Sequence, residues 1–494
     1  MRDRKSSFSF YPSISAVNFT LSAIFLVFLA SIWYVSDPAR AVRLDRYILY
    51  SIDDILRYCH IRVALTDISI FFNIYLKFLY ALIATFFYHL IPIGMPSLRI
   101  MNSLFSVATL FLLYKLTKVL GFQEKSGIFA ILITTVFPIY FLLSVSAFSE
   151  PIFSFFLILS LLALYREQYG VFSISISLLP LIRQPANGLL YLELGIFILI
   201  LKKPRLKYFF MLLVPTVLWC LFNVMFLKRT LMEIFFFNLA DRPQAPLDSI
   251  MFLSEVHPLY FIGFYPLLLL SIIGIFRKIP ERKFLFVFSY ILAQLIFIVL
   301  LNIIDYQTSG CIQQEYRVFM PIIPLLAIYE TVGIDWVLHK FIRTDRYKSA
   351  ALGLIGLCLF VFSVLQLQQL QKSPKLMEEK LSYKQEKELQ SAARWLNAYL
   401  KENNISNVYG HARELIREPI RKLWMYLDKG RNMYFIYMNV RIFDVLTWKV
   451  LPSNLVNNGV FVFTLARSEV AFEQPDYKLI KAFPDIPLYF YVID

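Results

Sequence analysis

Carboxylate and guanidinium side chains stand at the edges of long apolar segments in this chain, where an ionised group is costly. A charge within a membrane costs about 2.5–3.5 kcal/mol on insertion scales, so a retained one usually has a function. A carboxylate at such an edge can accept the proton of a hydroxyl group, and an arginine can hold a phosphate through two hydrogen bonds. These groups suit the transfer of a chemical group from an anionic, lipid-borne donor. The candidates are Asp45, Asp53, Asp54, Glu150, Arg183, Glu315 and Arg317.

Each acidic candidate also has a structural explanation. Asp45 begins a helix-like run, so capping of that helix competes on even terms with a catalytic role. Asp53 and Asp54 are better explained as water-facing residues of an amphipathic loop helix than as catalytic groups. Glu150 precedes Pro151 and is placed to begin a helix, although its apolar neighbours weaken that explanation.

The elements that must position these residues are membrane helices. The chain is 58% hydrophobic and contains 48 Phe, which is more apolar surface than a soluble domain can bury. Its net charge of +15 fits basic cytoplasmic loops and headgroup contacts, and gives no argument for binding nucleic acid. The basic start followed by the apolar stretch Phe19 to Val35 predicts a retained first span with the N-terminus inside.

Further apolar segments predict a helical bundle with about eleven spans. The segment 171–201 would be about 45 Å long as one helix, whereas a hydrocarbon core is about 30 Å thick. Pro180, Pro185 and Gly188 interrupt it, so two short spans are expected. The other segments are 98–118, 127–146, 151–164, 207–227, 258–277, 284–303, 318–338 and 349–366, with 68–91 predicted to lie on the outer leaflet rather than to span.

The distribution of lysine and arginine favours this topology. It places the basic loops 202–207, 277–283 and 339–348 in the cytoplasm and the C-terminus outside. All seven candidates then meet at the outer edge of the membrane. A lone arginine usually extends to lipid headgroups. For Arg183 and Arg317 a functional role competes with this explanation only because both arginines share a side of the membrane with the acids.

Composition changes to that of a soluble protein near residue 371. The sequence therefore predicts a transmembrane domain, 1–370, with an outer loop at 36–97, and an extracytoplasmic α/β domain, 371–494. The second domain should contain a charged helix from Glu378 to Lys401, with Leu389, Ala393, Leu396 and Leu400 at helical spacing. Strands are expected at 407–410, 459–464 and 487–493.

The order of these motifs resembles the GT-C superfamily of membrane glycosyltransferases, which use polyprenyl-phosphate sugars. Asp45-x-Tyr47 followed by Ile55-Leu56 is similar to the family's first-loop acid and short helix, and 112–150 to its second and third spans ending in a second acidic motif. PLIRQPANGLL and EYRVFMPIIPLL are similar to its turn between spans five and six and to its span near the lipid phosphate. Within the superfamily, the pattern resembles mannosyltransferases of the GPI II type and protein O-mannosyltransferases, and its rhythm also resembles oligosaccharyltransferase catalytic subunits.

The resemblance implies an inverting hexosyltransferase of GT-C fold. The general character of the chain favours a bacterial inner membrane over the endoplasmic reticulum. Its donor would be a polyprenyl-phosphate sugar and its acceptor a glycan, a lipid or a protein. Asp45 would be the catalytic carboxylate, Glu150 a second acidic group and Arg317 a contact to the donor phosphate. The first loop lacks a clean Asp-Glu or Asp-x-Asp pair, so Asp53 and Asp54 compete with Asp45. The family's Phe-Pro-x-x-Pro is also absent, so mannose is not fixed, and a divalent cation (magnesium or manganese) stays open.

Two other functions compete with this one. A polymerase or ligase of surface polysaccharide would also act on polyprenyl-linked sugars at the outer face. A flippase or transporter of lipid-linked glycans should show internal repeats and charges near the midplane, and neither pattern is visible. The order of preference is glycosyltransferase, polymerase or ligase, then transporter.

Overall fold

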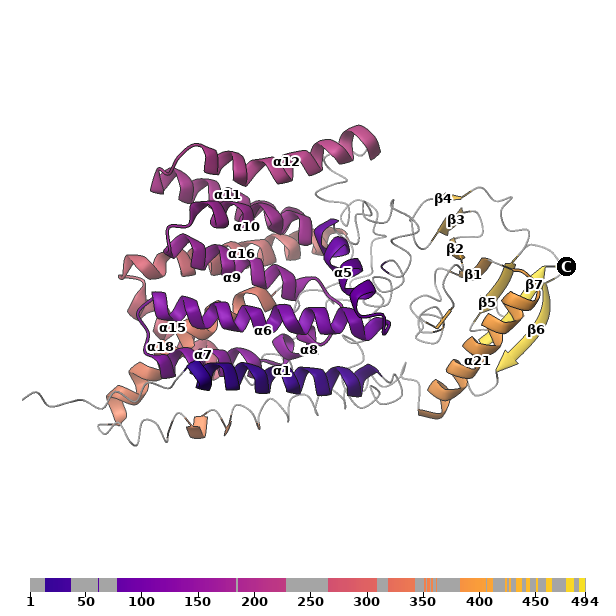
Figure 1. Cartoon of the computed structure of the whole chain (residues 1–494), viewed down its shortest axis with the longest axis horizontal. Coiled ribbons are helices and arrows are strands. Elements are labelled where there is room, and N and C mark those ends of the chain that lie inside the picture. Colours follow the sequence, from indigo (N-terminus) through magenta and orange to yellow (C-terminus); the bar gives the residue numbers. More distant parts are fainter. Residues whose placement is uncertain are drawn as a thin grey trace, which may run out of the picture.

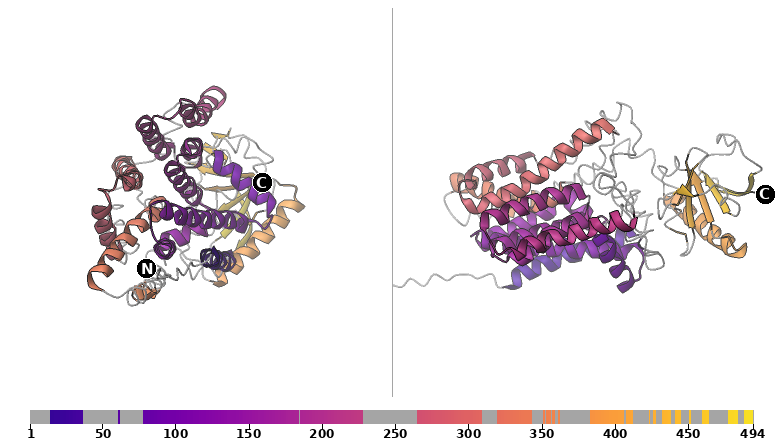
Figure 2. Two further views of the ribbon diagram at one scale, coloured as in Figure 1. Left: turned by 60° about the vertical axis from the view of Figure 1, so that its left-hand side comes forward. Right: turned by 90° about the horizontal axis from the view of Figure 1, so that it is seen from above.

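A computed structural model of the protein places a bundle of long helices beside a smaller body of strands and one helix (Figure 1). The two bodies are also separate when seen from above (Figure 2). The structure describes residues 14–36, 61, 78–183, 185–227, 265–308, 319–342, 351, 353–355, 357–358, 361, 383–405, 407–411, 423, 426–427, 432–437, 441–444, 450–451, 459–463, 477–483 and 488–493.

The described helices of the bundle coincide with predicted apolar segments. Apolar side chains cover the whole surface of such helices, so they can pack against lipid as well as against neighbouring helices. Helix α6 lies in its middle and packs against α1, α7 and α9. The helices are α1 (Ile14–Ser36), α5 (Phe78–Leu90), α6 (Met95–Val119), α7 (Glu124–Val136), α8 (Pro138–Ser144), α9 (Glu150–Tyr165), α10 (Tyr169–Ile182), α11 (Pro185–Lys202), α12 (Lys207–Leu227), α15 (Tyr265–Lys278), α16 (Arg282–Thr308) and α18 (Ile323–Phe341), the last preceded by the 3-10 helix η4 (Met320–Ile322).

Proline interrupts two of the predicted segments. The expected break in 171–201 is confirmed, because α10 ends at Ile182 and α11 begins at Pro185 and packs back against α10. The segment 127–146, predicted as a single span, is instead bent by 76° between α7 and α8. The bend lies at Phe137, directly before Pro138, whose ring disfavours helical backbone in the preceding residue.

The described part of helix α5 is shorter than a hydrocarbon core is thick. Its 13 residues span about 20 Å, against the roughly 30 Å of a hydrocarbon core. The Tyr80 hydroxyl donates a hydrogen bond to the carbonyl of Ala147, so α5 lies at the end of the bundle where α9 begins. Residues 68–77 lie outside the described residues, so the placement of 68–91 on the outer leaflet stays a prediction.

Length and composition qualify three described helices to cross a membrane. These are α6, α12 and the continuous run of η4 and α18, and the bent pair of α7 and α8 makes a fourth if it is counted as one span. Several other helices, such as α9 and α10, are apolar but shorter. The total of about eleven spans stays a prediction.

The smaller body contains a mixed sheet covered by one helix. Its strands lie in the order β4-β3-β2-β1-β5-β7-β6, and β1 runs parallel to both β2 and β5. Trp395 of the helix packs on Phe490 of the sheet, and Leu389, Ala393, Leu396 and Leu400 are buried as their spacing predicts. The elements are α21 (Tyr383–Glu402), β1 (Asn407–His411), β2 (Asn432–Tyr437), β3 (Arg441–Asp444), β4 (Val450–Leu451), β5 (Gly459–Phe463), β6 (Tyr477–Phe483) and β7 (Leu488–Ile493).

The predicted helix and three strands of the C-terminal region are thus present, at bounds within a few residues of those expected. The predicted boundary at residue 371 lies outside the described residues.

Helices α15 and α18 approach each other more closely than side chains would allow. A Cβ added to Gly274 would collide with the carbonyl oxygen of Tyr329, and one added to Gly333 would collide with that of Leu270. Beside these glycines, the Ser271 hydroxyl donates a 3.2 Å hydrogen bond to the buried Glu330 carboxyl group. The two glycines therefore fix the separation of the pair.

We expect Gly274→Ala to destabilise the bundle, because the new methyl group must push α15 away from α18. Overpacking of this kind costs about 1–3 kcal/mol. Thermal unfolding of the detergent-solubilised chain measures the effect. Gly353→Ala is the matched control, because no atom lies within 4 Å of the position that its Cβ would take. Equal melting temperatures for the two variants would refute the close packing.

Candidate active site

Glu150 is held at the start of α9. The helix begins at this residue, and its side chain lies in the first turn, where the partial positive charge of a helix N-terminus favours a carboxylate. The residue is only 3% exposed. The alternative predicted from sequence, a helix start, is therefore correct in position, and it does not exclude a functional role.

Arg183 directly follows the last residue of α10 and turns toward Glu150. Its Nη2 lies 3.3 Å from Oε1 of Glu150, and their side chains are 9% and 4% exposed. A buried ion pair loses the hydration of both charges, so it adds little to stability unless its geometry is fixed. A pair at this depth joins the start of one helix to the end of the next, and Arg183 does not simply extend into solvent.

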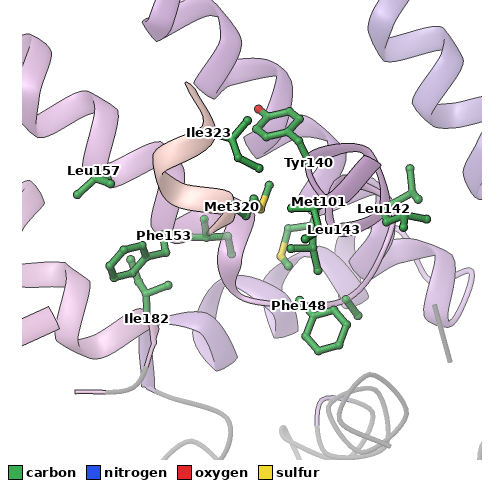
Figure 3. Packing of buried hydrophobic residues seen from close by; sticks show 14 of the residues in the cluster. Met101, Tyr140, Leu142, Leu143, Phe148, Phe153, Leu157, Ile182, Met320 and Ile323 are labelled. Carbon is green, nitrogen blue, oxygen red and sulfur yellow. The ribbon is translucent and has the colours of Figure 1, made fainter. Parts of the chain in front are cut away.

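An aromatic surface underlies the arginine. The guanidinium carbon of Arg183 lies 5.9 Å from the centre of the Phe153 ring, one helical turn after Glu150. Phe153 in turn meets Tyr191 of α11 edge to face, with 5.8 Å between the ring centres. Figure 3 shows Phe153 beside Ile182, the last residue of α10. The ring and the carboxylate both restrict the guanidinium.

Hydrogen bonds to side chains of α16 hold this aromatic surface. The Tyr191 hydroxyl lies 2.9 Å from Oε1 of Gln294 and donates to it. The hydroxyl groups of Tyr290 and Ser160 are 3.1 Å apart. Helices α9, α11 and α16 are thereby linked below the Glu150–Arg183 pair.

The non-helical segment before Glu150 is fixed by side chains from α5 and α6. Nδ2 of Asn102 donates to the carbonyls of Ser146 and Phe148, at 2.7 and 2.6 Å. The Tyr80 hydroxyl donates to the carbonyl between them, that of Ala147. Ser103 donates to the carbonyl of Ser144 at 2.8 Å. Because unsatisfied carbonyls are costly in apolar surroundings, these bonds determine where α9 and its first residue lie.

A second buried arginine lies one turn before Asn102. Arg99 is fully buried on α6, and its Nη2 is 3.7 Å from the sulfur of Met95. Arg99 and Asn102 are three residues apart and therefore share a face of α6. Buried polar residues on this face mark the same end of the bundle as Glu150.

Two of the seven predicted site residues are brought together. Glu150 and Arg183, predicted to share the outer edge of the membrane, form an ion pair. The remaining predicted residues lie outside the described residues; these are Asp45, Asp53, Asp54, Glu315 and Arg317. Sequence reasoning did not identify Asn102, Tyr80 or Tyr191, although a polar residue near the start of an apolar span is a usable signal for Asn102.

Nothing in the described part of the chain assembles a metal site. Within those residues, no group of three or more His, Cys, Asp and Glu side chains is placed to hold a metal ion. The first-loop aspartates are not among them, so the question of a divalent cation stays open.

No family model and no curated protein matches the chain in sequence. Its fold matches solved structures over almost its whole length. It superimposes on ArnT from Cupriavidus metallidurans in the apo state with a TM-score of 0.63 and 12% identity, covering 97% of this chain and 98% of that one. The same protein bound to undecaprenyl phosphate gives 0.61 and 11%, covering 95% and 97%.

At this identity the match shows the fold alone: this chain has the fold of ArnT over almost its whole length. The fold predicted from the short motifs, that of the GT-C superfamily, is the fold that ArnT has, and the transfer activity belongs to the proposal below. The mannosyltransferase subtypes are not supported.

We expect Asn102→Leu to destabilise the chain, because it leaves the carbonyls of Ser146 and Phe148 without their donor. An unsatisfied buried acceptor costs about 1–3 kcal/mol. Thermal unfolding in detergent measures the loss. Thr134→Val is the matched control, because the Thr134 hydroxyl donates its 2.8 Å hydrogen bond to the carbonyl of Ala130 in its own helix. A loss no larger than that of the control would contradict the role of Asn102.

Proposed function

We propose that the chain is a membrane glycosyltransferase that moves a hexose from a polyprenyl-phosphate donor to a glycan, lipid or protein acceptor. The observation that carries the proposal is the buried ion pair of Glu150 and Arg183. It lies in a GT-C fold, at the start of a helix predicted to begin at the outer face of the membrane. A structural scaffold would have no need for such a pair.

Arg183 is suited to contact the donor phosphate. A guanidinium held by a carboxylate at 3.3 Å and by an aromatic ring at 5.9 Å does not have to reorganise when charge develops on a leaving group. Its planar donors match the geometry of phosphate oxygens better than an ammonium group does. In this proposal Glu150 orients Arg183, and Arg317 and Glu315 complete the donor site.

The reaction is an inverting displacement at the anomeric carbon. The acceptor hydroxyl oxygen forms a bond to that carbon while the bond from the carbon to the phosphate oxygen breaks. The hydroxyl proton passes to a carboxylate, for which Asp45 is the first candidate and Asp53 and Asp54 are the alternatives. Polyprenyl phosphate departs with the electron pair, and the charge on its oxygen is stabilised by arginine. Positioning of donor and acceptor supplies most of the remaining rate enhancement.

The solved ArnT structure bound to undecaprenyl phosphate supports a donor of this class for the present chain. Its location would be a bacterial inner membrane, with the N-terminus in the cytoplasm and the C-terminal domain outside. A polymerase or ligase of surface polysaccharide would use the same site with a longer glycan on its lipid.

Reconstituted transfer from a panel of polyprenyl-phosphate sugars tests the proposal. We expect Arg183→Ala and Glu150→Gln each to lower kcat about 100-fold, because the first removes the guanidinium that contacts the leaving phosphate and the second removes the charge that orients this guanidinium. Asp45→Asn should abolish transfer.

Arg166→Ala is the matched control, since Arg166 is an exposed arginine at the opposite end of α9, and it should keep wild-type activity. Full activity of both Arg183→Ala and Glu150→Gln would disprove the site. A wild-type chain that transfers no sugar of the panel, but extends lipid-linked glycans, would instead favour the polymerase.

A further inference from the structure

Two cations converge on one tryptophan at the end of the bundle opposite Glu150. The guanidinium carbon of Arg277 lies 4.7 Å from the Trp336 ring centre, and the Lys340 ammonium lies 5.2 Å from the same centre. Arg277 is in the last turn of α15 and Lys340 in the last turn of α18. The carbonyls of helix C-termini and the face of an indole ring both favour positive charge, which explains why two cations are tolerated there.

Neighbouring cations at this end are neutralised within the protein. Lys278 and Lys283 both pair with Glu281, and Lys283 also donates a 2.6 Å hydrogen bond to the carbonyl of Leu120. The hydrogen bond from Lys278 and the charge of Lys283 hold the pKa of the Glu281 carboxyl below its usual range. The contacts of these lysines join the turn between α15 and α16 to the end of α6, so both lysines have a structural role.

Arg277 and Lys340 differ from these lysines. In the part of the chain that the structure describes, neither cation forms an ion pair with a carboxylate, although the exposed Asp335 precedes Trp336. Two like charges beside one ring repel each other, and an anion that contacts both would relieve that repulsion. The chemistry of the pair is therefore that of a phosphate site.

The helix ends that carry the two cations are held in a fixed relation. Their helices meet at Gly274 and Gly333 with backbone in contact, and the Ser271–Glu330 hydrogen bond lies beside this contact. An anion that contacts both helix ends therefore needs no rearrangement of the protein, which favours binding.

An exposed apolar stripe leads away from the cations along α15. Its side chains are Leu269, Ile272 and Phe276, which are 61%, 48% and 75% exposed, and it ends at Arg277. Their spacing of three and four residues places them on one face of the helix, which is turned away from the Gly274 face that meets α18. A ligand with a phosphate at one end and hydrocarbon chains at the other matches this arrangement, whereas a free phosphate uses only the cations.

We propose that Arg277, Lys340 and Trp336 bind the anionic headgroup of a phospholipid, whose acyl chains lie along Leu269, Ile272 and Phe276. The site is separate from the Glu150–Arg183 pair and does not depend on the proposed transfer reaction. It would retain one anionic lipid on the α15–α18 pair.

Native mass spectrometry of the full chain in detergent, titrated with phosphatidylglycerol or with phosphatidylcholine of the same chains, tests this site. We expect phosphatidylglycerol to bind the wild type more tightly than phosphatidylcholine does. The single variants Arg277→Gln and Lys340→Gln should each weaken phosphatidylglycerol binding about fivefold. Both side chains are exposed, and if the Arg277→Gln variant does not fold, the Lys340→Gln variant by itself tests the site.

Lys207→Gln is the matched control, because Lys207 lies 5.2 Å from a single ring, that of Tyr208, with no second cation on that ring among the described residues. It should bind phosphatidylglycerol as the wild type does. The site is refuted if phosphatidylcholine binds equally well, if Lys207→Gln is weakened as much as Lys340→Gln, or if inorganic phosphate at equal concentration displaces the lipid.

Discussion

The contact between Glu150 and Arg183 is the interaction on which the proposed site depends. Each ion loses several kcal/mol of hydration on burial, and mutual attraction compensates for this only when their geometry is well defined. The start of α9 and the end of α10 must therefore be held in register. Phe153 supports the guanidinium from below, and Tyr191 and Gln294 tie that ring to α11 and α16. Four helices thus contribute to the placement of one arginine.

Backbone hydrogen bonding explains the position of the carboxylate. The segment 145–149 is not helical, yet it is buried, so its carbonyls need donors from elsewhere. Asn102 and Tyr80 supply them, and the resulting bonds fix the path of the chain into α9. A polar side chain inside an apolar helix thereby satisfies backbone carbonyls that no regular secondary structure would satisfy. The bend at Phe137 is what brings this segment back to α6.

Features carried by a local pattern could be predicted from the sequence. Three helix-breaking residues in 171–201 predicted the turn at Arg183, and helical spacing predicted the buried face of α21. The bend between α7 and α8 was missed, because hydropathy stays high across Pro138 and the segment resembles one span. Asn102 and Tyr80 were missed for a different reason: their partners lie far along the chain, and no local pattern encodes such a contact. Gly274 and Gly333 likewise gain their meaning only from the opposite helix.

The interior below the ion pair also bears on the choice between a transferase and a transporter. A transporter needs a polar path through the middle of the membrane that can open to either side. Below Glu150 and Arg183 the described residues are instead fully buried aromatics, Phe153, Tyr191 and Tyr290, with both tyrosine hydroxyls engaged. The buried carboxyl group of Glu330 accepts a hydrogen bond from Ser271 beside the contact where α15 and α18 approach backbone to backbone. Close packing beneath the ion pair therefore agrees better with the proposed transferase than with a transporter, whose substrate would have to cross that interior.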